Sequence, residues 1–108
     1  MSVPNVSAYA HWAYASLYLG ALGRFAEAVA EMGKAVDLDP LNATWRGILS
    51  AHLANAGQYD RAIEAGRRSV ELAENYFAPR MLLGEAYLGA GRIGDAVASL
   101  EEAHPLWP

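Results

Sequence analysis

The sequence contains no cysteine and few basic residues, and each shortage excludes a class of protein. Without cysteine, the chain cannot form a disulfide framework, hold zinc through thiolates or use a cysteine as a nucleophile. Eight basic against twelve acidic residues give a formal net charge of −4. Binding to nucleic acid needs a basic face that neutralises several phosphates, so no nucleic-acid partner is predicted.

Long apolar segments are absent as well. No stretch reaches the roughly 18 apolar residues that a membrane-spanning helix needs. The N-terminal stretch MSVPNVSA lacks the basic and apolar regions of a secretory signal. Together with the lack of cysteine, this predicts a cytoplasmic protein without a membrane partner. Seven of the eight basic residues are arginine and alanine is abundant, which is typical of proteins from GC-rich bacterial genomes.

Catalytic signatures are also missing from the sequence. It contains no nucleophile elbow, no phosphate-binding Walker loop and no protein-kinase motif. The histidines, His11, His52 and His104, do not follow the i, i+4 spacing of a helical metal site. Adjacent carboxylates such as Glu101 and Glu102 are typical of a solvated helix end. We therefore predict that the protein is not an enzyme and needs no metal or other cofactor.

The sequence does contain an internal period of 34 residues, marked by Gly23, Gly57 and Gly91. The same interval relates further sets without a gap, namely Ala28, Ala62 and Ala96; Ala35, Ser69 and Ala103; Leu38, Leu72 and Leu106; Leu19, Leu53 and Tyr87. With 54% hydrophobic residues, the chain can build a packed core. We therefore expect one domain of three repeated units, with the first alanine set where two helices cross closely.

Each unit has the pattern of two helices around a tight turn. Apolar residues recur at steps of three and four on both sides of each repeated glycine, which predicts amphipathic helices. The stripe of the first helix consists of Trp12, Ala15, Leu19 and Leu22. We expect this helix to end at Gly23 in the left-handed conformation. No segment alternates with the period of a strand, so the prediction is six helices and no sheet.

Several residues indicate where the later helices begin and end. The residue before Pro40 disfavours helical backbone, so the second helix is expected to stop there. Asn42 and Asn75 are predicted N-caps of the third and fifth helices. Pro79 falls in the first turn of the fifth helix, where its missing N–H costs little. The sixth helix is expected over residues 93–103.

The segment GAGRIG, residues 89–94, has the letters of a dinucleotide-binding loop, G-x-G-x-x-G. Such a loop follows a strand, and none is predicted here. Of the three glycines, only Gly91 recurs with the period of the chain. We therefore interpret the segment as a turn between two helices and not as a phosphate-binding loop.

The repeated units resemble the tetratricopeptide repeat, whose signature is W-x2-L-G-x2-Y, then A-x3-F, then P over 34 residues. The matching residues include Trp12, Ala28, Met32 and Pro40 in the first unit, Leu49, Leu53 and Ala62 in the second, and Leu83, Gly84, Tyr87, Ala96, Leu100 and Pro108 in the third. The departures include Arg46 and Arg80 at the tryptophan position and Gly66 in place of a large apolar residue.

This resemblance implies the fold and its boundaries. The fold is all-α, an α-solenoid of six antiparallel helices in a right-handed superhelix. Residues 1–8 form an N-terminal lead and residues 9–108 form the repeat domain. The repeats are expected at 9–42, 43–76 and 77–108, without a C-terminal capping helix.

The resemblance also implies function by binding, because members of this family are mostly protein-interaction modules. The first helices of successive repeats line a concave groove that takes a peptide or a helix of a partner protein. The groove residues are then Tyr14, Leu17, Ile48, Ala51, Asn55, Met81, Leu82, Glu85 and Leu88. A wider set adds Ala10, Ala13, Ala21, Thr44, Gly47, Ala78 and Gly89. Packing of these residues against one another is the alternative.

Chaperone-binding members of the family carry lysine, asparagine and arginine in the groove, and these residues clamp a C-terminal carboxylate. This sequence has Ala13, Leu17, Ile48, Met81 and Leu82 at or near those places. We therefore predict that it does not bind such tails and that its groove takes an apolar peptide face or helix. An apolar small molecule is a further alternative.

The last helix is expected to have no successor that covers its outer face. The predicted uncovered residues are Ala96, Val97, Leu100, Leu106 and Trp107. Large uncovered apolar patches mark interfaces. Two hypotheses follow: the chain is a piece of a longer bacterial repeat protein, or its copies form a homo-oligomer through their ends. The sequence does not identify the protein or peptide partner.

Overall fold

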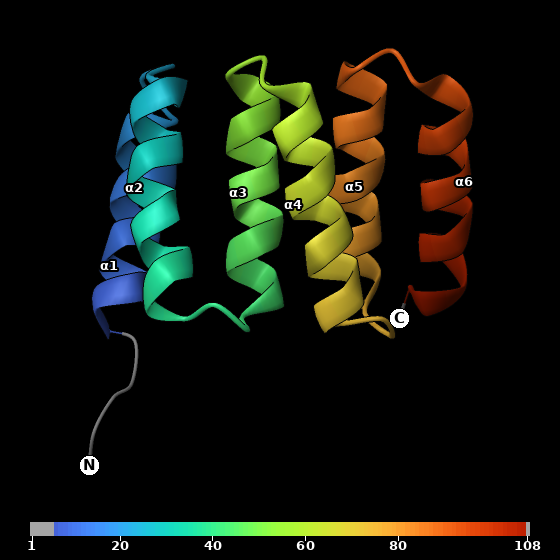
Figure 1. The fold of residues 1–108 in the computed structure, drawn as a ribbon, viewed down its shortest axis with the longest axis horizontal. Coiled ribbons are helices and arrows are strands. Elements are labelled where there is room, and N and C mark those ends of the chain that lie inside the picture. Colours follow the sequence, from blue (N-terminus) through green and yellow to red (C-terminus); the bar gives the residue numbers. More distant parts are fainter. Residues whose placement is uncertain (1–5, 108) are drawn as a thin grey trace.

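A computed structural model describes residues 6–107 of the chain (Figure 1). Within this range the backbone forms helices and no strands. The elements are α1 (Val6–Ala13), the π-helix η1 (Tyr14–Leu19), α2 (Phe25–Leu38), α3 (Ala43–Asn55), α4 (Tyr59–Leu72), α5 (Phe77–Gly89), α6 (Ile93–Ala103) and the short 3-10 turn η2 (His104–Leu106). Since η1 directly continues α1, the described part of the chain contains the six predicted helices. The predictions for residues 1–5 and Pro108 lie outside the described residues.

Most helix ends lie where the sequence places them. α2 ends before the pair Asp39-Pro40, and α6 covers the predicted range Ile93–Ala103. Pro79 lies in the first turn of α5. The start of the first helix differs, because α1 already includes Val6 and therefore overlaps the predicted N-terminal lead of residues 1–8.

The 34-residue period recurs in the hydrogen bonds of the turns. Gly23, Gly57 and Gly91 have φ angles of 74°, 79° and 78°. These values confirm the predicted left-handed conformation, which favours glycine because a Cβ is strained there. In each turn the glycine N–H donates to the carbonyl three residues earlier, and the next N–H donates to the carbonyl five residues earlier. This pair of bonds is the Schellman motif, and it satisfies carbonyls at the end of each first helix.

The two predicted N-caps have different outcomes. Asn42 caps α3, because its side-chain oxygen accepts a hydrogen bond from the Trp45 N–H at 3.0 Å. The prediction for Asn75 is wrong: the N-cap of α5 is Tyr76, which makes no side-chain hydrogen bond to the helix. The Tyr76 ring instead packs edge-on against Phe77, with 5.2 Å between the ring centroids. Aromatic packing thus takes the place of a polar cap at this helix start.

The first helix also differs from the regular α-helix that its apolar spacing predicts. Residues 14–19 form a π-helix, and the Gly20 N–H donates to the Ala15 carbonyl, five residues earlier, at 2.8 Å. The helix therefore ends at Leu19, and Leu22 lies in the turn that follows it. Ala15 and Leu19 are buried as predicted, whereas Leu22 is 57% exposed, so its assignment to the apolar stripe is wrong.

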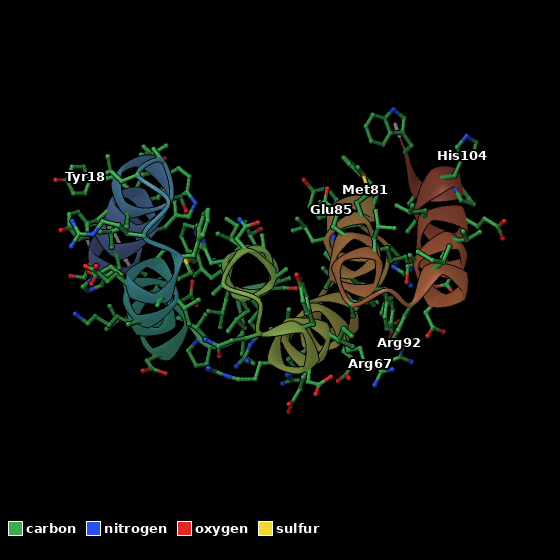
Figure 2. The ribbon with its side chains drawn as sticks, turned by 90° about the horizontal axis from the view of Figure 1, so that it is seen from above. Tyr18, Arg67, Met81, Glu85, Arg92 and His104 are labelled. Atoms are coloured by element: carbon green, nitrogen blue, oxygen red, sulfur yellow. The ribbon has the colours of Figure 1, made fainter. Side chains whose placement is uncertain are left out.

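Seen from above, the helices follow an arc with two layers (Figure 2). The first helix of each pair, namely α1 with η1, α3 and α5, lies on the inner side of the arc. The second helices, α2, α4 and α6, lie on the outer side. Helices that follow each other in the chain pack together, and α3 also contacts α5. The arrangement is the predicted α-solenoid.

The core lies between the two layers in two clusters of buried side chains. Met32 and Trp45 belong to the first cluster, and Leu53 and Leu83 belong to the second. Leu49 packs against both clusters and connects them. The repeated alanines are no more than 2% exposed, which confirms their predicted place between closely packed helices: Ala28, Ala62 and Ala96.

Candidate functional site

The first helices of the three pairs carry the residues that the family resemblance assigns to a groove. The exposed members of this set are Tyr14, Leu17, Asn55, Glu85 and Leu88. The half-buried members are Ile48, Ala51, Met81 and Leu82. Figure 2 places Met81 and Glu85 on the side of α5 that faces the inner side of the arc. Every residue of the set therefore keeps some surface open.

A small hollow lies between α3 and α5. Its volume is about 70 Å³, and its lining is mostly apolar: Ala43, Thr44, Ile48, Ser69, Tyr76, Ala78, Pro79 and Leu82. Two predicted groove residues, Ile48 and Leu82, thus come together from neighbouring repeats. The hollow has room for a single partner side chain, and it is the best-defined apolar feature that these helices share.

The two helices approach closely beside the hollow because Gly47 has no side chain. A Cβ at this position would lie 2.9 Å from Leu82 Cδ1 and 3.2 Å from Ser69 Oγ. The Ser69 hydroxyl donates to the Ala43 carbonyl at 2.6 Å, which joins α4 to the start of α3. Gly47 is buried, so its predicted contact with a partner is wrong. It positions Leu82 at the hollow instead.

Two further glycines mark close approaches between helices. A Cβ on Gly89 would lie 2.7 Å from Tyr59 Cε1, at the start of α4. Gly89 therefore makes room for a side chain of the outer layer, and its predicted role in the groove is wrong. A Cβ on Gly66 would lie 3.0 Å from Leu83 Cδ1 and 3.2 Å from Leu83 Cα. This contact explains why glycine replaces a large apolar residue of the repeat signature.

Tyr14 lies apart from the hollow. Its ring stacks on Tyr18, with 5.3 Å between the centroids and 18° between the planes. Figure 2 shows Tyr18 pointing away from α3, at the edge of the arc. Both tyrosines and Leu17 come from the π-helical η1 and are exposed. The structure therefore does not bring Tyr14 to the hollow that Ile48 and Leu82 line.

Sequence reasoning missed a polar contact between the first and third helices. His52 is buried, and its Nε2 lies 2.9 Å from Ser16 Oγ. Burial lowers the pKa of His52 below its ordinary value of 6.5, because a low-dielectric environment disfavours the charged imidazolium. A signal was present in the sequence: the two residues are 36 positions apart, close to the period of the chain.

A second polar contact joins the first helix to α2. His11 Nδ1 lies 2.5 Å from Glu31 Oε1, and Lys34 Nζ lies 3.1 Å from the other carboxylate oxygen. The hydrogen bond with His11, followed by the bond with Lys34, holds the pKa of the Glu31 carboxyl below its ordinary value. These contacts hold the helix pair together and do not form part of the hollow.

The two arginines of the inner helices are both directed away from the hollow. Arg46 of α3 donates through Nε to the Pro40 carbonyl at 2.8 Å and lines a depression next to α4. Arg80 of α5 donates to the Glu74 carbonyl and lies 3.5 Å from a carboxylate oxygen of Glu102 in α6. No lysine occurs in α1, η1, α3 or α5. The lining of the hollow therefore carries no cation.

The predicted apolar patch at the last helix is largely open. Its exposed members are Val97, Leu100 and Trp107, and Leu106 is half-buried. The Trp107 ring packs on Phe77, with 4.6 Å between the centroids. Ala96 differs from the prediction, because it is buried in the second core cluster against residues of α5.

The remaining motifs have structural interpretations. GAGRIG runs from the end of α5 through the turn at Gly91 into α6, and no strand occurs in the described part of the chain. Residues 6–107 contain no group of three or more histidine and carboxylate side chains placed to hold a metal ion. Over the same range, every helix is too short or too polar to cross a membrane.

The fold is an α-solenoid of helix pairs that repeat every 34 residues, and the comparison with known families agrees with it. The sequence profile described as "Tetratricopeptide repeat" matches residues 15–77. The match covers more than half of the chain. The chain therefore belongs to the tetratricopeptide repeat family.

Individual relatives share the repeat over different lengths. The chain is 34% identical over 86 residues to the Hsp70-Hsp90 organizing protein of Triticum aestivum, but these residues are 80% of this chain and only 15% of that protein. The second tetratricopeptide domain of Spaghetti (RPAP3), bound to the HSP90 peptide SRMEEVD, has a TM-score of 0.82 at 16% identity, covering 95% of this chain and 94% of that one. The crystal structure of MamA has a TM-score of 0.78 at 22% identity, covering 94% and 59%. At these identities, the two structures show the shared fold.

Proposed function

We propose that the inner side of the arc binds an apolar face of a partner peptide or helix. The observation that carries the proposal is the apolar hollow between α3 and α5, which Ile48 and Leu82 line. In helix-in-groove recognition, apolar side chains of the partner insert between side chains of the receiving helices. Membership of a family of interaction modules supports binding, and not catalysis, as the role of this chain.

The size of the hollow favours a macromolecular partner over a small molecule. Pockets for drug-sized ligands enclose about 300–1,000 Å³, whereas this hollow encloses about 70 Å³. One side chain of a partner fills it. The rest of the contact then falls on the accessible surface around it, including Met81 and Leu88 of α5.

The charge of this side favours apolar peptides over carboxylate tails. The RPAP3 domain is described as bound to the HSP90 peptide SRMEEVD, and the wheat relative is named for Hsp70 and Hsp90. In the present chain, Arg46 and Arg80 are engaged away from the hollow. We propose that this chain has no clamp for a C-terminal carboxylate.

A peptide titration tests the proposed groove. The probe is a fluorescein-labelled amphipathic helical peptide that carries leucines on one face. We expect Met81→Gln with Leu88→Gln to weaken binding about tenfold, or about 1.4 kcal/mol. The matched control is Leu38→Gln with Leu41→Gln, two exposed leucines at the α2–α3 connection. Equal weakening by both double variants contradicts a specific inner binding face.

A second titration tests the absence of a clamp. The peptide SRMEEVD is compared with the same peptide amidated at its C-terminus. We expect the two forms to bind with the same affinity, because no cation lines the hollow. A strong preference for the free carboxylate, lost in the Met81→Gln and Leu88→Gln double variant, contradicts the proposal.

The open patch on α6 favours self-association as a second candidate function. Val97 and Trp107 present apolar surface there, and Tyr14 and Tyr18 do so at the other end of the arc. Sedimentation over a range of concentrations tests this candidate. We expect the mass to rise with concentration in the native chain and to stay constant after Val97→Gln with Trp107→Gln. A constant monomer mass in the native chain removes the candidate.

A further inference from the structure

The outer side of the arc carries a second surface of different chemistry. An open depression of about 460 Å³ lies over α3 and α4. Four arginines line it, and the side chains of Leu49 and Leu53 contribute an apolar part: Arg46, Arg61, Arg67 and Arg68. We call this surface the arginine depression. It holds half of the eight basic residues of a chain whose net charge is −4.

Most of this positive charge is not neutralised locally. The glutamates Glu64 and Glu71 also line the depression. Of these, Glu71 lies 3.2 Å from an Arg68 nitrogen. Among the ion pairs of residues 6–107, none involves Arg46, Arg61 or Arg67. The depression therefore keeps three guanidinium groups without a carboxylate partner.

Neutral oxygens hold these three guanidinium groups in place. Arg46 donates to a backbone carbonyl, and Arg61 donates to the Gln58 side chain. Arg67 Nε donates to the Tyr87 hydroxyl at 3.0 Å. A guanidinium has five N–H donors, so each group retains donors for a ligand. Groups already ordered in the free protein lose less conformational entropy on binding.

The position of the surface separates it from the hollow. Figure 2 shows Arg67 and Arg92 on the outer side of the arc, whereas Met81 and Glu85 lie on the inner side. Arg92 also lies over the Tyr87 ring, 4.9 Å from its centroid, and pairs with Asp95 at 2.7 Å. A ligand on the arginine depression therefore contacts residues different from those of a ligand on the inner side.

We propose that the arginine depression binds an acidic peptide segment that carries an apolar side chain. Guanidinium groups pair with carboxylates in a planar, two-bond geometry, and Arg46, Arg61 and Arg67 offer this geometry to successive acidic residues. The apolar side chain of the peptide covers Leu49 and Leu53. A nucleic acid is disfavoured, because its backbone requires many phosphate contacts and the neighbouring glutamates repel it.

Fluorescence anisotropy tests this proposal. The probe is an acetylated and amidated peptide of glutamate and aspartate around one central leucine, so it has no terminal charge. We expect Arg46→Gln with Arg61→Gln to weaken binding about tenfold. The matched control, Arg24→Gln with Lys34→Gln, changes the net charge equally outside the depression and should keep the native affinity. Circular dichroism checks the fold of each variant, and Arg61→Gln alone provides a variant of one exposed residue.

Each remaining outcome decides the proposal. Replacing the central leucine by glycine should weaken binding, because the apolar contact is lost; an unchanged affinity contradicts the described mode. Tighter binding of a short DNA duplex than of the peptide overturns it in favour of a nucleic acid. Loss of peptide binding in the Met81→Gln and Leu88→Gln double variant places the peptide on the inner side and also overturns it. Equal weakening by the control double variant does the same.

Discussion

Small residues set the distances between the helices of this protein. Gly47 and Gly66 face side chains of α5, and a Cβ at either position would lie 3.0 Å or less from a leucine methyl group. Ser50 and Ser69 add hydrogen bonds to backbone carbonyls, at 2.7 and 2.6 Å. These contacts join neighbouring repeats, so single methyl groups are expected to affect both stability and the shape of the hollow.

The first prediction concerns Gly66. Gly66→Ala brings a Cβ within 3.2 Å of the Leu83 backbone, which cannot move away as a flexible side chain does. Gly33→Ala is the matched control, because it lies in α2 with no atom within 4 Å of its Cβ. We expect the Gly66 variant to be less stable than the control by about 1–3 kcal/mol in urea unfolding. Equal stability of the two variants would contradict the close contact.

The second prediction concerns His52 and pH. Burial lowers the pKa of His52 in the folded chain below the value of 6.5, so the unfolded chain binds the proton first as the pH falls. The contribution to the free energy of unfolding is complete above about pH 6.5 and decreases below it. Unfolding measured from about pH 7.5 to about pH 5.5 should therefore show a slope that His52→Gln reduces. An unchanged slope in the variant contradicts the assignment.

At the scale of helices and turns, local chemistry decides where each element ends. The three glycine turns repeat the same pair of hydrogen bonds. The starts of the helices are less uniform: α3 has a polar cap from Asn42, whereas α5 begins at an aromatic pair. The first helix widens into the π-helix of residues 14–19. Each difference exposes or orders side chains at the edge of the arc.

The third prediction compares the two asparagines that precede helices. Asn42→Ala removes the acceptor for the Trp45 N–H and should lower the free energy of unfolding by about 1 kcal/mol. Asn75→Ala is the control, because the N-cap of α5 is its neighbour Tyr76 and the change removes no cap. Thermal or urea unfolding measures both variants. A loss at Asn75 as large as that at Asn42 contradicts the distinction between the two starts.

The elements were predictable to the extent that their signals are local. Glycine in the left-handed conformation, the stop before Pro40 and the cap at Asn42 each act within a few residues, and the structure confirms all three. The π-helix was not predictable, because the same apolar spacing fits a regular α-helix. The start of α5 was missed because ring packing of Tyr76 on Phe77 competes with a polar cap.

At the scale of the whole molecule, the two core clusters are not independent. Leu49 packs against both of them, and Val29 of α2 belongs to the second cluster while its neighbour Met32 belongs to the first. In repeat proteins, stability is approximately the sum of the repeat units and the interfaces between neighbours. Shared side chains at these interfaces should make the chain unfold as one unit.

The fourth prediction is that unfolding is cooperative across the arc. Trp12 and Trp45 report the first cluster by fluorescence, and Trp107→Phe removes the remaining tryptophan. We expect the fluorescence and circular dichroism transitions in urea to have the same midpoint. An earlier fluorescence transition would show that the first repeat unfolds separately and would contradict the shared core.

The candidate site was less predictable than the fold. The period placed Ile48 and Leu82 on neighbouring first helices, and the structure brings them to one hollow. Gly47 and Gly89 were misassigned, because the sequence does not show which side of a helix meets another helix. The arginine depression was missed because its residues look thinly spread along the chain. Cytoplasmic location and bacterial origin stay predictions.

The recurrence of the turn bonds makes the length of the arc adjustable. Every closing donor meets an acceptor at the same offset from its glycine. Inserting a second copy of residues 43–76 after the first would preserve every such offset and add one more helix pair. The insert would also duplicate the four arginines of the outer depression, since all of them lie within this range. An insert of any other length would place the following glycine out of register, so the arc can be lengthened only in whole repeats.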